Sequence, residues 1–450
     1  MMGRNAGSSW ARIALFVLLC ISAGCAARSP SPRTPEVASP TAAVATSVTQ
    51  SDTSAHTVMP TSSVPPQATT SPYLPTAPPS MGRILFTVAE RDYVAPLYKW
   101  GGANDIWLIE EDTGVPRRWI EDNLFKRQPA ASPDSTRVAY VVSKIVGDQP
   151  KESVWVAALD GTSPRQVSPT YGIDSPVLIE GMAPSRVEYV RRYLRVVYVA
   201  LCGWSADGQR LAYIVRGESW GDPHVLCVLD LPTGQVTRIG GYDTDSASWS
   251  LTDPELLVMN QFVTPYLVNV RTGQQVKVDE LEDKDIRTIW APDGRHLLAT
   301  VVDRAIHPVK EEGIVIVDKD TRTSQWLDVK GAEDALWSPD GRKIAYVSNL
   351  SGDRGIQKSS LLVISNGKET KLLVEQDVLN VYARPFAWSL DSKWIVGFGN
   401  PPRKREVASL YLVNAETGEM TVWAASLAAP GDNRMVWCYQ SCCVNGGWFG

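Results

Sequence analysis

The stretch Trp337-Ser338-Pro339-Asp340-Gly341-Arg342-Lys343-Ile344-Ala345-Tyr346 decides the fold, because looser copies of it recur along the 450-residue chain. The other copies begin at Ala131, Trp204, Trp249, Trp290 and Trp388, so that successive copies start 73, 45, 41, 47 and 51 residues apart. A period of about 40 to 50 residues with strand-like content is typical of a β-propeller, in which each repeat forms one four-stranded blade. The sequence therefore predicts an all-β fold.

Each position of this phrase has a structural reason. An Asp-Gly pair between apolar stretches marks a tight turn, because Gly tolerates positive φ and Asp accepts hydrogen bonds from the nearby backbone. The preceding Pro presets φ for the turn. Ile344-Ala345-Tyr346 then predicts a short strand buried on both faces. We interpret the Trp of each copy as packing between blades rather than stacking on a ligand. The Asp residues at equivalent positions, which are Asp207, Asp293, Asp340 and Asp391, are interpreted as turn residues.

A second pattern counts the blades independently. Seven outer hairpins, each an apolar strand, a polar turn and another strand, lie at Ile106–Trp119, Val154–Val167, Val225–Ile239, Tyr266–Val278, Ile314–Leu327, Leu361–Leu373 and Leu410–Trp423. Seven hairpins against six copies of the phrase predict a seven-bladed propeller, with six blades as the alternative.

The two ends of the propeller supply the missing strand in this interpretation. Ile84–Val88 resembles a second strand whose first strand is absent, and Trp437 lies 49 residues after Trp388. We therefore expect Met435–Cys438 to pair with Ile84–Val88 and to close the ring without a free edge. The residues after Trp437 do not repeat the phrase.

The N-terminus predicts export. Arg4 and Arg12 precede a short apolar run, Ile13–Cys20, which is too short for the ~20 residues of a membrane span. Small residues directly before Cys25 resemble a bacterial lipobox, in which the Cys is lipidated and becomes the new N-terminus. We interpret residues 1–24 as a lipoprotein signal peptide. Because Ser22 stands where a lipobox usually has Leu, cleavage by a general signal peptidase is the alternative.

Residues 25–80 differ in composition from the rest of the chain. The segment is dominated by Pro, Ser, Thr and Ala, and it cannot bury enough apolar surface to fold. It is predicted to be a disordered stalk with a flexible reach of ~40 Å, followed by the propeller in residues 81–450. The expected location is a bacterial cell envelope, with the propeller facing the periplasm or the exterior.

The charge of the chain restricts its partners. A net charge of −5 argues against a nucleic-acid partner, since such partners require a basic surface. We expect a protein or glycan of the envelope as partner, and contact with the membrane through the lipid anchor only.

The cysteines fall into two groups. Cys202 and Cys227 are expected in the first and third strands of one blade, which lie too far apart for a disulfide, so each is interpreted as a small buried hydrophobe. Cys438, Cys442 and Cys443 are the candidates for a disulfide near the ring closure. No His lies near them in sequence and their spacing is not a known zinc pattern, so neither a metal nor a cofactor is predicted.

One catalytic motif is rejected. Gly217-Glu218-Ser219-Trp220-Gly221 matches the G-x-S-x-G nucleophile elbow of α/β-hydrolases. That elbow requires a strand-to-helix turn in an α/β sheet, whereas this copy lies between two expected propeller strands. We therefore name no catalytic residue.

One segment interrupts the repeat, at about Pro169–Leu194. Val187, Val190, Leu194 and Val197 are spaced like one face of a helix, and Arg186, Arg191, Arg192 and Arg195 lie beside them. One interpretation is a basic, partly helical protrusion that binds a protein or an anionic ligand. The favoured one is a solvated loop followed by the next inner strand at Leu194–Leu201.

The repeat resembles the WD40-like (PD40) repeats of TolB-family proteins, on the Trp-Ser-Pro-Asp-Gly phrase and the Ile-Ala-Tyr strand, and it is similar to the blades of prolyl oligopeptidase-type propellers. This resemblance covers residues 81–450. It implies an extracytoplasmic propeller that binds or scaffolds proteins or glycans without catalysis. The alternative is a propeller enzyme, or an accessory subunit, acting on peptides or polysaccharides at the mouth of the channel.

Overall fold

The structure is a computed structural model that describes residues 83–90, 103–109, 116–146, 149–218, 221–261, 264–281, 286–301, 313–327, 329, 332–351, 357–365, 368–374, 386–399, 409–424 and 448–449. The predicted signal peptide and stalk lie outside the described residues. So do Cys25, Cys438, Cys442 and Cys443. All described residues belong to one compact unit, Thr69–Gly450.

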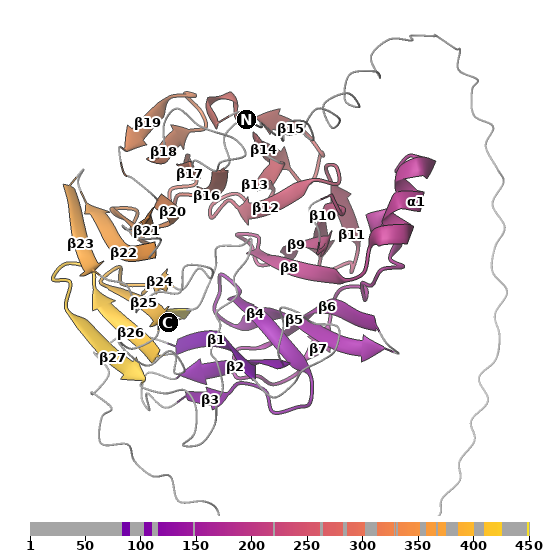
Figure 1. The fold of residues 1–450 in the computed structure, drawn as a ribbon, viewed down its shortest axis with the longest axis horizontal. Coiled ribbons are helices and arrows are strands. Elements are labelled where there is room, and N and C mark those ends of the chain that lie inside the picture. The colour runs from indigo at the N-terminus through magenta and orange to yellow at the C-terminus, as the bar shows by residue number, and fades with distance from the viewer. Residues whose placement is uncertain are drawn as a thin grey trace, which may run out of the picture. The chain divides into compact units, whose positions relative to one another are not determined.

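The described residues form seven four-stranded antiparallel sheets, numbered here in chain order (Figure 1). Sheet 1 has the order β28-β1-β2-β3, and each later sheet uses four consecutive strands. The strands of sheets 1 to 3 are β28 (Trp448–Phe449), β1 (Arg83–Glu90), β2 (Ala103–Ile109), β3 (Pro116–Arg118), β4 (Phe125–Ala131), β5 (Arg137–Val146), β6 (Gln149–Ala158), β7 (Arg165–Gln166), β8 (Val197–Trp204), β9 (Arg210–Gly217), β10 (His224–Asp230) and β11 (Val236–Ile239).

The strands of sheets 4 to 7 follow without a long helical interruption. They are β12 (Thr244–Trp249), β13 (Leu256–Gln261), β14 (Thr264–Asn269), β15 (Gln275–Lys277), β16 (Ile286–Trp290), β17 (His296–Val301), β18 (Gly313–Asp318), β19 (Ser324–Leu327), β20 (Ala332–Trp337), β21 (Lys343–Ser351), β22 (Gln357–Ser365), β23 (Lys368–Val374), β24 (Phe386–Trp388), β25 (Trp394–Gly399), β26 (Ser409–Asn414) and β27 (Met420–Ala424). Helical turns in the described residues are η1 (Pro176–Leu178), α1 (Pro184–Tyr193) and η2 (Asp279–Leu281).

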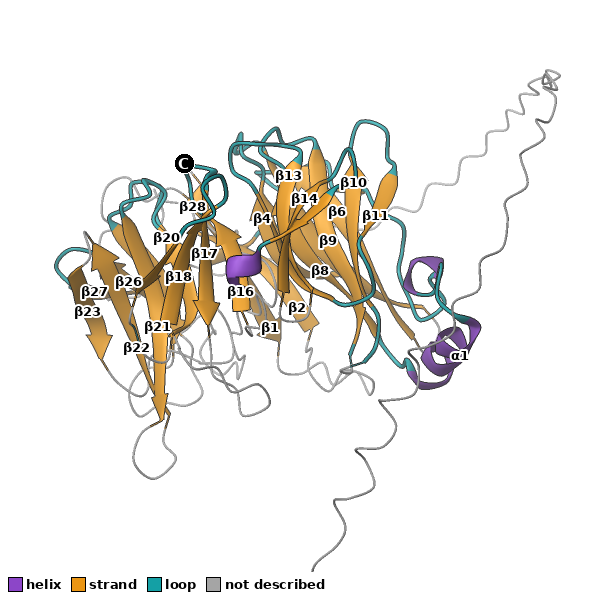
Figure 2. Ribbon diagram, turned by 90° about the horizontal axis from the view of Figure 1, so that it is seen from above, coloured by secondary structure: helices purple, strands orange, loops and turns teal. Residues whose placement is uncertain are grey.

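The sheets pack face to face on their neighbours, which makes the fold an all-β propeller. The first strands β4, β8, β12 and β16 contact one another in succession. Each apolar cluster joins two consecutive sheets: Val154 of sheet 2, for example, shares a cluster with Leu211 of sheet 3, and Met259 of sheet 4 shares one with Ile214 of sheet 3. In Figure 2 the sheets stand side by side, and α1 lies near one end of their strands. The core is therefore a set of layers between sheets rather than one central mass.

Hydrogen bonds explain why the repeated phrase forms a turn. Ser338 Oγ accepts from the Lys343 backbone N–H at 2.9 Å and donates to Asp340 Oδ1 at 2.6 Å. Asp340 Oδ1 also accepts from the Arg342 N–H at 3.0 Å, and Gly341 takes a φ of +69°. The same Ser–Asp pairing occurs at Ser132–Asp134, Ser205–Asp207 and Ser389–Asp391. Asp207, Asp340 and Asp391 are therefore turn residues, as predicted. Asp293 is one as well, because it accepts from the Arg295 N–H at 2.8 Å.

The Trp of the phrase joins neighbouring sheets through its indole. Trp204 Nε1 donates to the Ala130 carbonyl at 2.8 Å, Trp290 Nε1 to Ser248 at 3.1 Å, and Trp388 Nε1 to Leu336 at 3.3 Å. In each case the acceptor directly precedes the first phrase residue of the preceding sheet. The predicted packing of these Trp side chains between blades is confirmed. We call this contact the interblade indole bond.

Two copies of the phrase lack this bond. Trp249 Nε1 and Trp337 Nε1 are buried and have no hydrogen-bond partner in the described residues. Both side chains still pack between sheets, in the clusters that join sheets 3 and 4 and sheets 5 and 6. Apolar contact is thus common to all these positions, and the hydrogen bond is an addition at some of them.

The ring closure differs in detail from the prediction. The C-terminal end does supply the missing strand of sheet 1, but it does so through β28, in which Phe449 pairs with Arg83 and Trp448 with Ile84. The expected pairing of Met435–Cys438 with Ile84–Val88 is therefore wrong at Ile84, and Met435–Cys438 lies outside the described residues. The lost repeat after Trp437 gave no pattern that could set the register.

The two kinds of Trp position allow the hydrogen bond to be measured apart from the packing. Trp290→Phe removes the donor to the Ser248 carbonyl, whereas Trp249→Phe removes the same volume and no hydrogen bond. Trp290→Phe should lower the free energy of unfolding by about 1 kcal/mol more than Trp249→Phe does. Urea denaturation of the two variants measures this difference, and equal losses would show that the bond contributes nothing.

Candidate partner-binding surface

The segment that interrupts the repeat contains a helix. α1 (Pro184–Tyr193) lies between sheets 2 and 3, and β8 begins only at Val197. The favoured prediction of a solvated loop up to Leu194 is therefore wrong, and the helical interpretation is confirmed. Pro184 at the first helical position has a preset φ, and the apolar residues at 187, 190 and 194 follow helical spacing. The expected inner strand is correct from Val197 onward.

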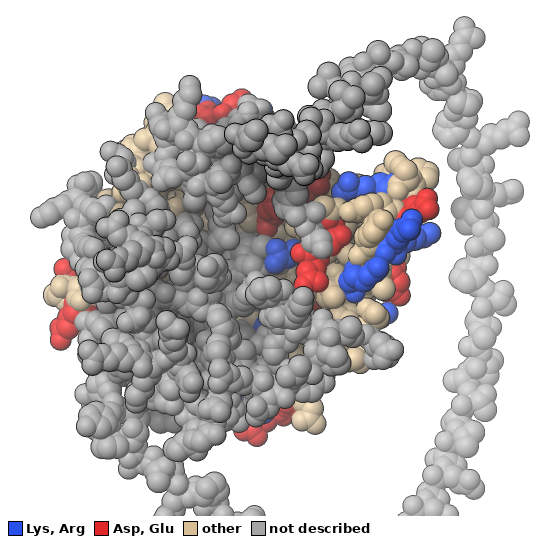
Figure 3. Space-filling model, viewed as in Figure 1, with Lys and Arg blue, Asp and Glu red and all other residues tan. Residues whose placement is uncertain are grey.

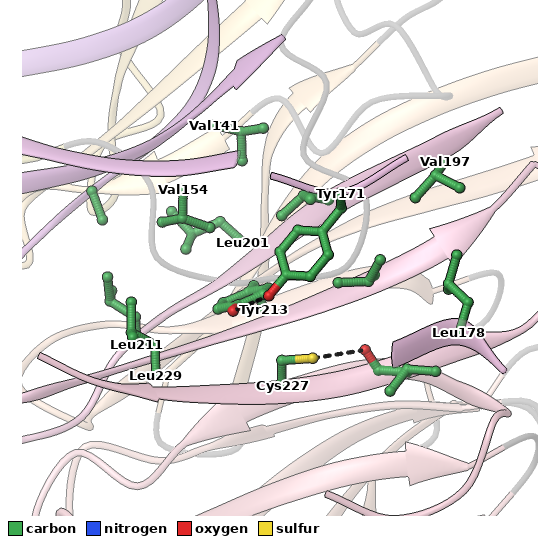
Figure 4. Packing of buried hydrophobic residues seen from close by; sticks show 14 of the residues in the cluster. Val141, Val154, Tyr171, Leu178, Val197, Leu201, Leu211, Tyr213, Cys227 and Leu229 are labelled. Atoms are coloured by element: carbon green, nitrogen blue, oxygen red, sulfur yellow. Dashed lines mark hydrogen bonds between the residues drawn. The ribbon is translucent and has the colours of Figure 1, made fainter. Parts of the chain in front are cut away.

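The buried face of this segment fixes it to the propeller. Tyr171, Leu178, Val190 and Leu194 are at most 4% exposed, and all four belong to the apolar cluster between sheets 2 and 3. Figure 4 shows Tyr171 reaching Tyr213 of β9 within this cluster, and their hydroxyl oxygens are 2.6 Å apart. Burial raises the pKa of both hydroxyls further above their ordinary value, which is already well above pH 7, so the hydrogen bond joins two neutral groups. The segment is thus part of the core.

Polar contacts hold the outer side of the segment. Arg186 Nη2 donates to the Gly221 carbonyl at 3.0 Å, which joins α1 to the connection between β9 and β10. Arg238 of β11 and the Tyr242 hydroxyl both donate to the Glu180 carbonyl, and the Arg238 guanidinium lies 3.9 Å from the centre of the Tyr242 ring. Together with the buried face, these contacts keep α1 in one orientation.

The outward face of α1 carries two tyrosines and basic residues. Tyr189 and Tyr193 are 46% and 51% exposed, and their ring centres lie 4.7 Å apart. The Arg192 guanidinium lies 5.7 Å from the centre of the Tyr193 ring. Arg186, Arg191 and Arg195 are also exposed. In Figure 3 basic side chains gather on this part of the surface, with acidic ones at its margins. We call residues 185–195 on this face the arginine–tyrosine surface.

The four arginines are not equivalent. Arg186 bonds the Gly221 carbonyl, and Arg195 Nη1 donates to the Arg192 carbonyl at 2.8 Å, which satisfies the last turn of the helix. Within the described residues, no carboxylate lies within salt-bridge distance of any of the four, and the guanidinium groups of Arg191 and Arg192 donate no hydrogen bond. Arg191 and Arg192 are therefore the two whose guanidinium groups a ligand could engage without breaking a hydrogen bond within the described residues.

A second polar cluster joins sheets 2 and 3 near the same end of the strands. Glu152 is fully buried: it accepts from Arg127 Nη2 at 2.5 Å, from Ser143 Oγ at 2.7 Å and from the Val199 N–H at 2.6 Å. Arg127 Nη2 also donates to the Val199 carbonyl at 2.9 Å. These side chains satisfy backbone groups on the edge of β8 that faces away from β9, so their role is structural.

The same edge has one more unusual contact. Gln128 adopts a φ of +55° at a bulge in β4, and its Oε1 accepts from the Leu201 N–H at 3.0 Å. A positive φ in a residue other than Gly is strained, and here the bond to β8 explains it. Nearby, burial raises the pKa of Tyr198 to about 12, with Glu218 and Glu152 adding to the effect. This hydroxyl is neutral at pH 7 and is a hydrogen-bonding group rather than a base.

The other sequence candidates can now be placed. Cys202 and Cys227 are free, buried and on β8 and β10, as predicted, and burial raises the pKa of the Cys227 thiol to about 12. The G-x-S-x-G match starts at the end of β9 and is followed by β10, which confirms its position between propeller strands, although Ser219 lies outside the described residues.

The described part of the chain contains no group of three or more His, Cys, Asp and Glu residues arranged to hold a metal. Nor does any helix in it have the length and hydropathy needed to cross a membrane.

By sequence, the chain matches no protein-family model and no curated protein. Its fold is similar to that of TolB from Acinetobacter baumannii, which is 16% identical over 70% of this chain and 75% of TolB, with a TM-score of 0.41. The propeller domain of the trilobed protease from Pyrococcus furiosus is 14% identical over 66% of this chain and 82% of the domain, with a TM-score of 0.43.

A puromycin-hydrolyzing peptidase from Mycobacterium tuberculosis is 13% identical and has a TM-score of 0.48. The match covers 79% of this chain and 53% of the peptidase. These similarities concern the fold alone. The fold class, a β-propeller, is given by the four-stranded antiparallel sheets of the described residues themselves.

The structural role of Glu152 can be tested. Glu152→Gln preserves volume but leaves the Arg127 guanidinium without its buried counter-charge, so the free energy of unfolding should fall by about 3 kcal/mol. Asp174→Asn is the matched control, because it removes an exposed carboxylate 3.4 Å from Lys151 and should cost less than ~1 kcal/mol. Urea denaturation compares the two, and similar losses would contradict a structural role for Glu152.

Proposed function

We propose that the chain is a lipid-anchored extracytoplasmic β-propeller that binds or scaffolds a protein or glycan of the cell envelope without catalysis. The observation that carries this proposal is the arginine–tyrosine surface. It lies where the sequence departs from the blade repeat, its helix is fixed through Val190 and Leu194, and it exposes aromatic and basic groups to solvent. Exposed aromatic side chains and Arg on a rigid support are typical of binding sites.

Binding is favoured over chemistry because the described polar groups near the end of the ring have structural partners. The Glu152 carboxylate accepts three hydrogen bonds from protein groups, and Arg127 donates to two protein acceptors. The turn Asp residues accept from their own turns, and the Ser132 hydroxyl donates a hydrogen bond that lowers the pKa of Asp134. A catalytic carboxylate needs a free face and a shifted proton affinity at a site open to substrate.

The anchor follows from the N-terminal sequence. A lipid on Cys25 and a stalk with a flexible reach of ~40 Å would hold the propeller at the membrane while leaving α1 free to meet a partner in the surrounding layer. The location proposed is the periplasm or the cell exterior.

Loss of the anchor has a simple readout. Cys25→Ala should move most of the protein from the membrane fraction to the soluble extracytoplasmic fraction, because no acyl chains could be attached. Fractionation with immunoblotting measures the shift, and Cys20→Ala serves as the control that should stay in the membrane fraction. Unchanged membrane association of Cys25→Ala would refute the anchor.

The binding surface can be tested in the intact envelope. A photo-crosslinking residue at Tyr189 should give discrete higher-mass products on irradiation, because this side chain is 46% exposed on the proposed surface. The same residue at Leu390, which is 56% exposed in a turn of sheet 7, is the matched control. Products of equal yield from both positions, or none from Tyr189, would remove the support for this surface.

A further inference from the structure

We infer that the ligand of the arginine–tyrosine surface is an anionic glycan: a polysaccharide chain whose sugars carry carboxylate or phosphodiester groups. This inference rests on the proposed function, since it names the partner of the same surface. Three properties of α1 support it, namely the charge of its outward face, the exposed tyrosine pair and the rigid, elongated shape of the helix.

The positive charge of the arginine–tyrosine surface indicates that the ligand is negatively charged. Residues 185–195 contain four arginines and one acidic residue, Glu188, and all five side chains are exposed. The guanidinium groups of Arg191 and Arg192 have no acceptor in the described residues. Guanidinium groups bind carboxylates and phosphates through two parallel hydrogen bonds, which a Lys could not reproduce. An anionic group with paired oxygens is therefore the complementary partner.

The tyrosine pair indicates a sugar. Tyr189 and Tyr193 lie one helical turn apart with their ring centres 4.7 Å from each other and their planes inclined by 41°, so the two rings contact each other beside Arg192. The negative face of an aromatic ring attracts polarised C–H groups, which cover one face of a pyranose ring. The Tyr hydroxyls can in turn exchange hydrogen bonds with sugar hydroxyls.

The composition of the outward face disfavours a bilayer or a dry protein interface. Helices that lie in a membrane expose Leu, Phe or Trp along one face, and protein interfaces of high affinity surround an apolar centre. Among the described residues, the large apolar or aromatic side chains exposed on α1 are Tyr189 and Tyr193 alone. A face of this kind stays hydrated, which suits a polar polymer.

The shape of the surface suits a linear chain. α1 has 10 residues, which corresponds to a length of ~15 Å. Around the helix, Arg191 lies on one side of Arg192 and the tyrosines lie on the other side. Because Val190 and Leu194 fix the helix in the core, an extended polymer could lie along it without the entropic cost of ordering the protein.

Binding of defined polymers to the purified full-length chain tests this inference. The probes are polygalacturonate, the same polymer with its carboxyls methyl-esterified, and a polysaccharide of phosphodiester-linked hexoses, which separates the carboxylate source of anions from the phosphate source. We expect binding of at least one anionic polymer and none of the ester. The Kd should rise about tenfold in Arg191→Ala/Arg192→Ala and in Tyr189→Ala/Tyr193→Ala. Glu188→Gln should lower it severalfold, because the variant removes the one negative charge on this face.

The matched control is Arg165→Ala/Arg342→Ala, which removes two exposed arginines elsewhere on the propeller and should leave the Kd unchanged. Circular dichroism melting checks that each variant is folded. Three results would overturn the inference: equal losses in the control and the α1 variants, binding of the ester as strong as that of the anionic polymer, or tighter binding of phosphatidylglycerol vesicles or poly-glutamate that depends on the same arginines.

Failure of the inference is distinguishable from failure of the proposed function. If the purified chain binds no anionic polymer but a crosslinker at Tyr189 still captures a discrete protein in the envelope, the surface binds a protein and the glycan assignment is wrong. If neither polymer binding nor specific crosslinking is found, both the anionic-glycan inference and the proposed binding surface are wrong.

Discussion

The structure depends on the contact that each sheet makes with the next, because no blade buries its own two faces. The first strand of a blade also has one edge without a neighbouring strand, and side chains from the preceding sheet fill the deficit at β8: Glu152 and Gln128 accept from its N–H groups, and Arg127 donates to its carbonyl. The Trp204 indole, on the same strand, makes a further contact between the two sheets by donating to the Ala130 carbonyl of sheet 2. Apolar layers give most of the stability, and these directed bonds fix the register of one sheet on another.

Those features that depend on nearby residues could be predicted from sequence. The turn at Ser338–Gly341 is formed by side chains that bond their own backbone, so its pattern is visible in four consecutive residues. Contacts between distant segments left no comparable pattern. The Tyr171–Tyr213 pair joins residues 42 positions apart, and the pairing of Phe449 with Arg83 joins the two ends of the propeller. In neither case does the sequence around one residue indicate which distant residue it contacts.

The helix shows an intermediate case. The apolar spacing of the helix was present in the sequence, but three apolar residues over eight positions also fit a loop that leads into an inner strand, and propensity alone could not separate the two. Tertiary packing decided the outcome, since Leu178 and Val190 found space between sheets 2 and 3. The four arginines were recognisable as a group, whereas their division into Arg186 and Arg195 with backbone partners and Arg191 and Arg192 without them required the geometry of the helix end and of Gly221.

The distribution of the interblade indole bonds has a consequence for how the propeller is built. The bonds at Trp204, Trp290 and Trp388 join sheets 2 to 3, 4 to 5 and 6 to 7, whereas the unpartnered indoles of Trp249 and Trp337 lie at the seams between those pairs. The contacts between sheets therefore differ around the described ring: indole bonds join three pairs of sheets, whereas Arg210 Nη1 of sheet 3 donates to the Pro254 carbonyl of sheet 4 at 3.2 Å. Since the unpartnered indoles stay buried in the same kind of apolar layer, the indole bond is a feature in which one repeat can differ from the next while the stacking of the sheets is retained.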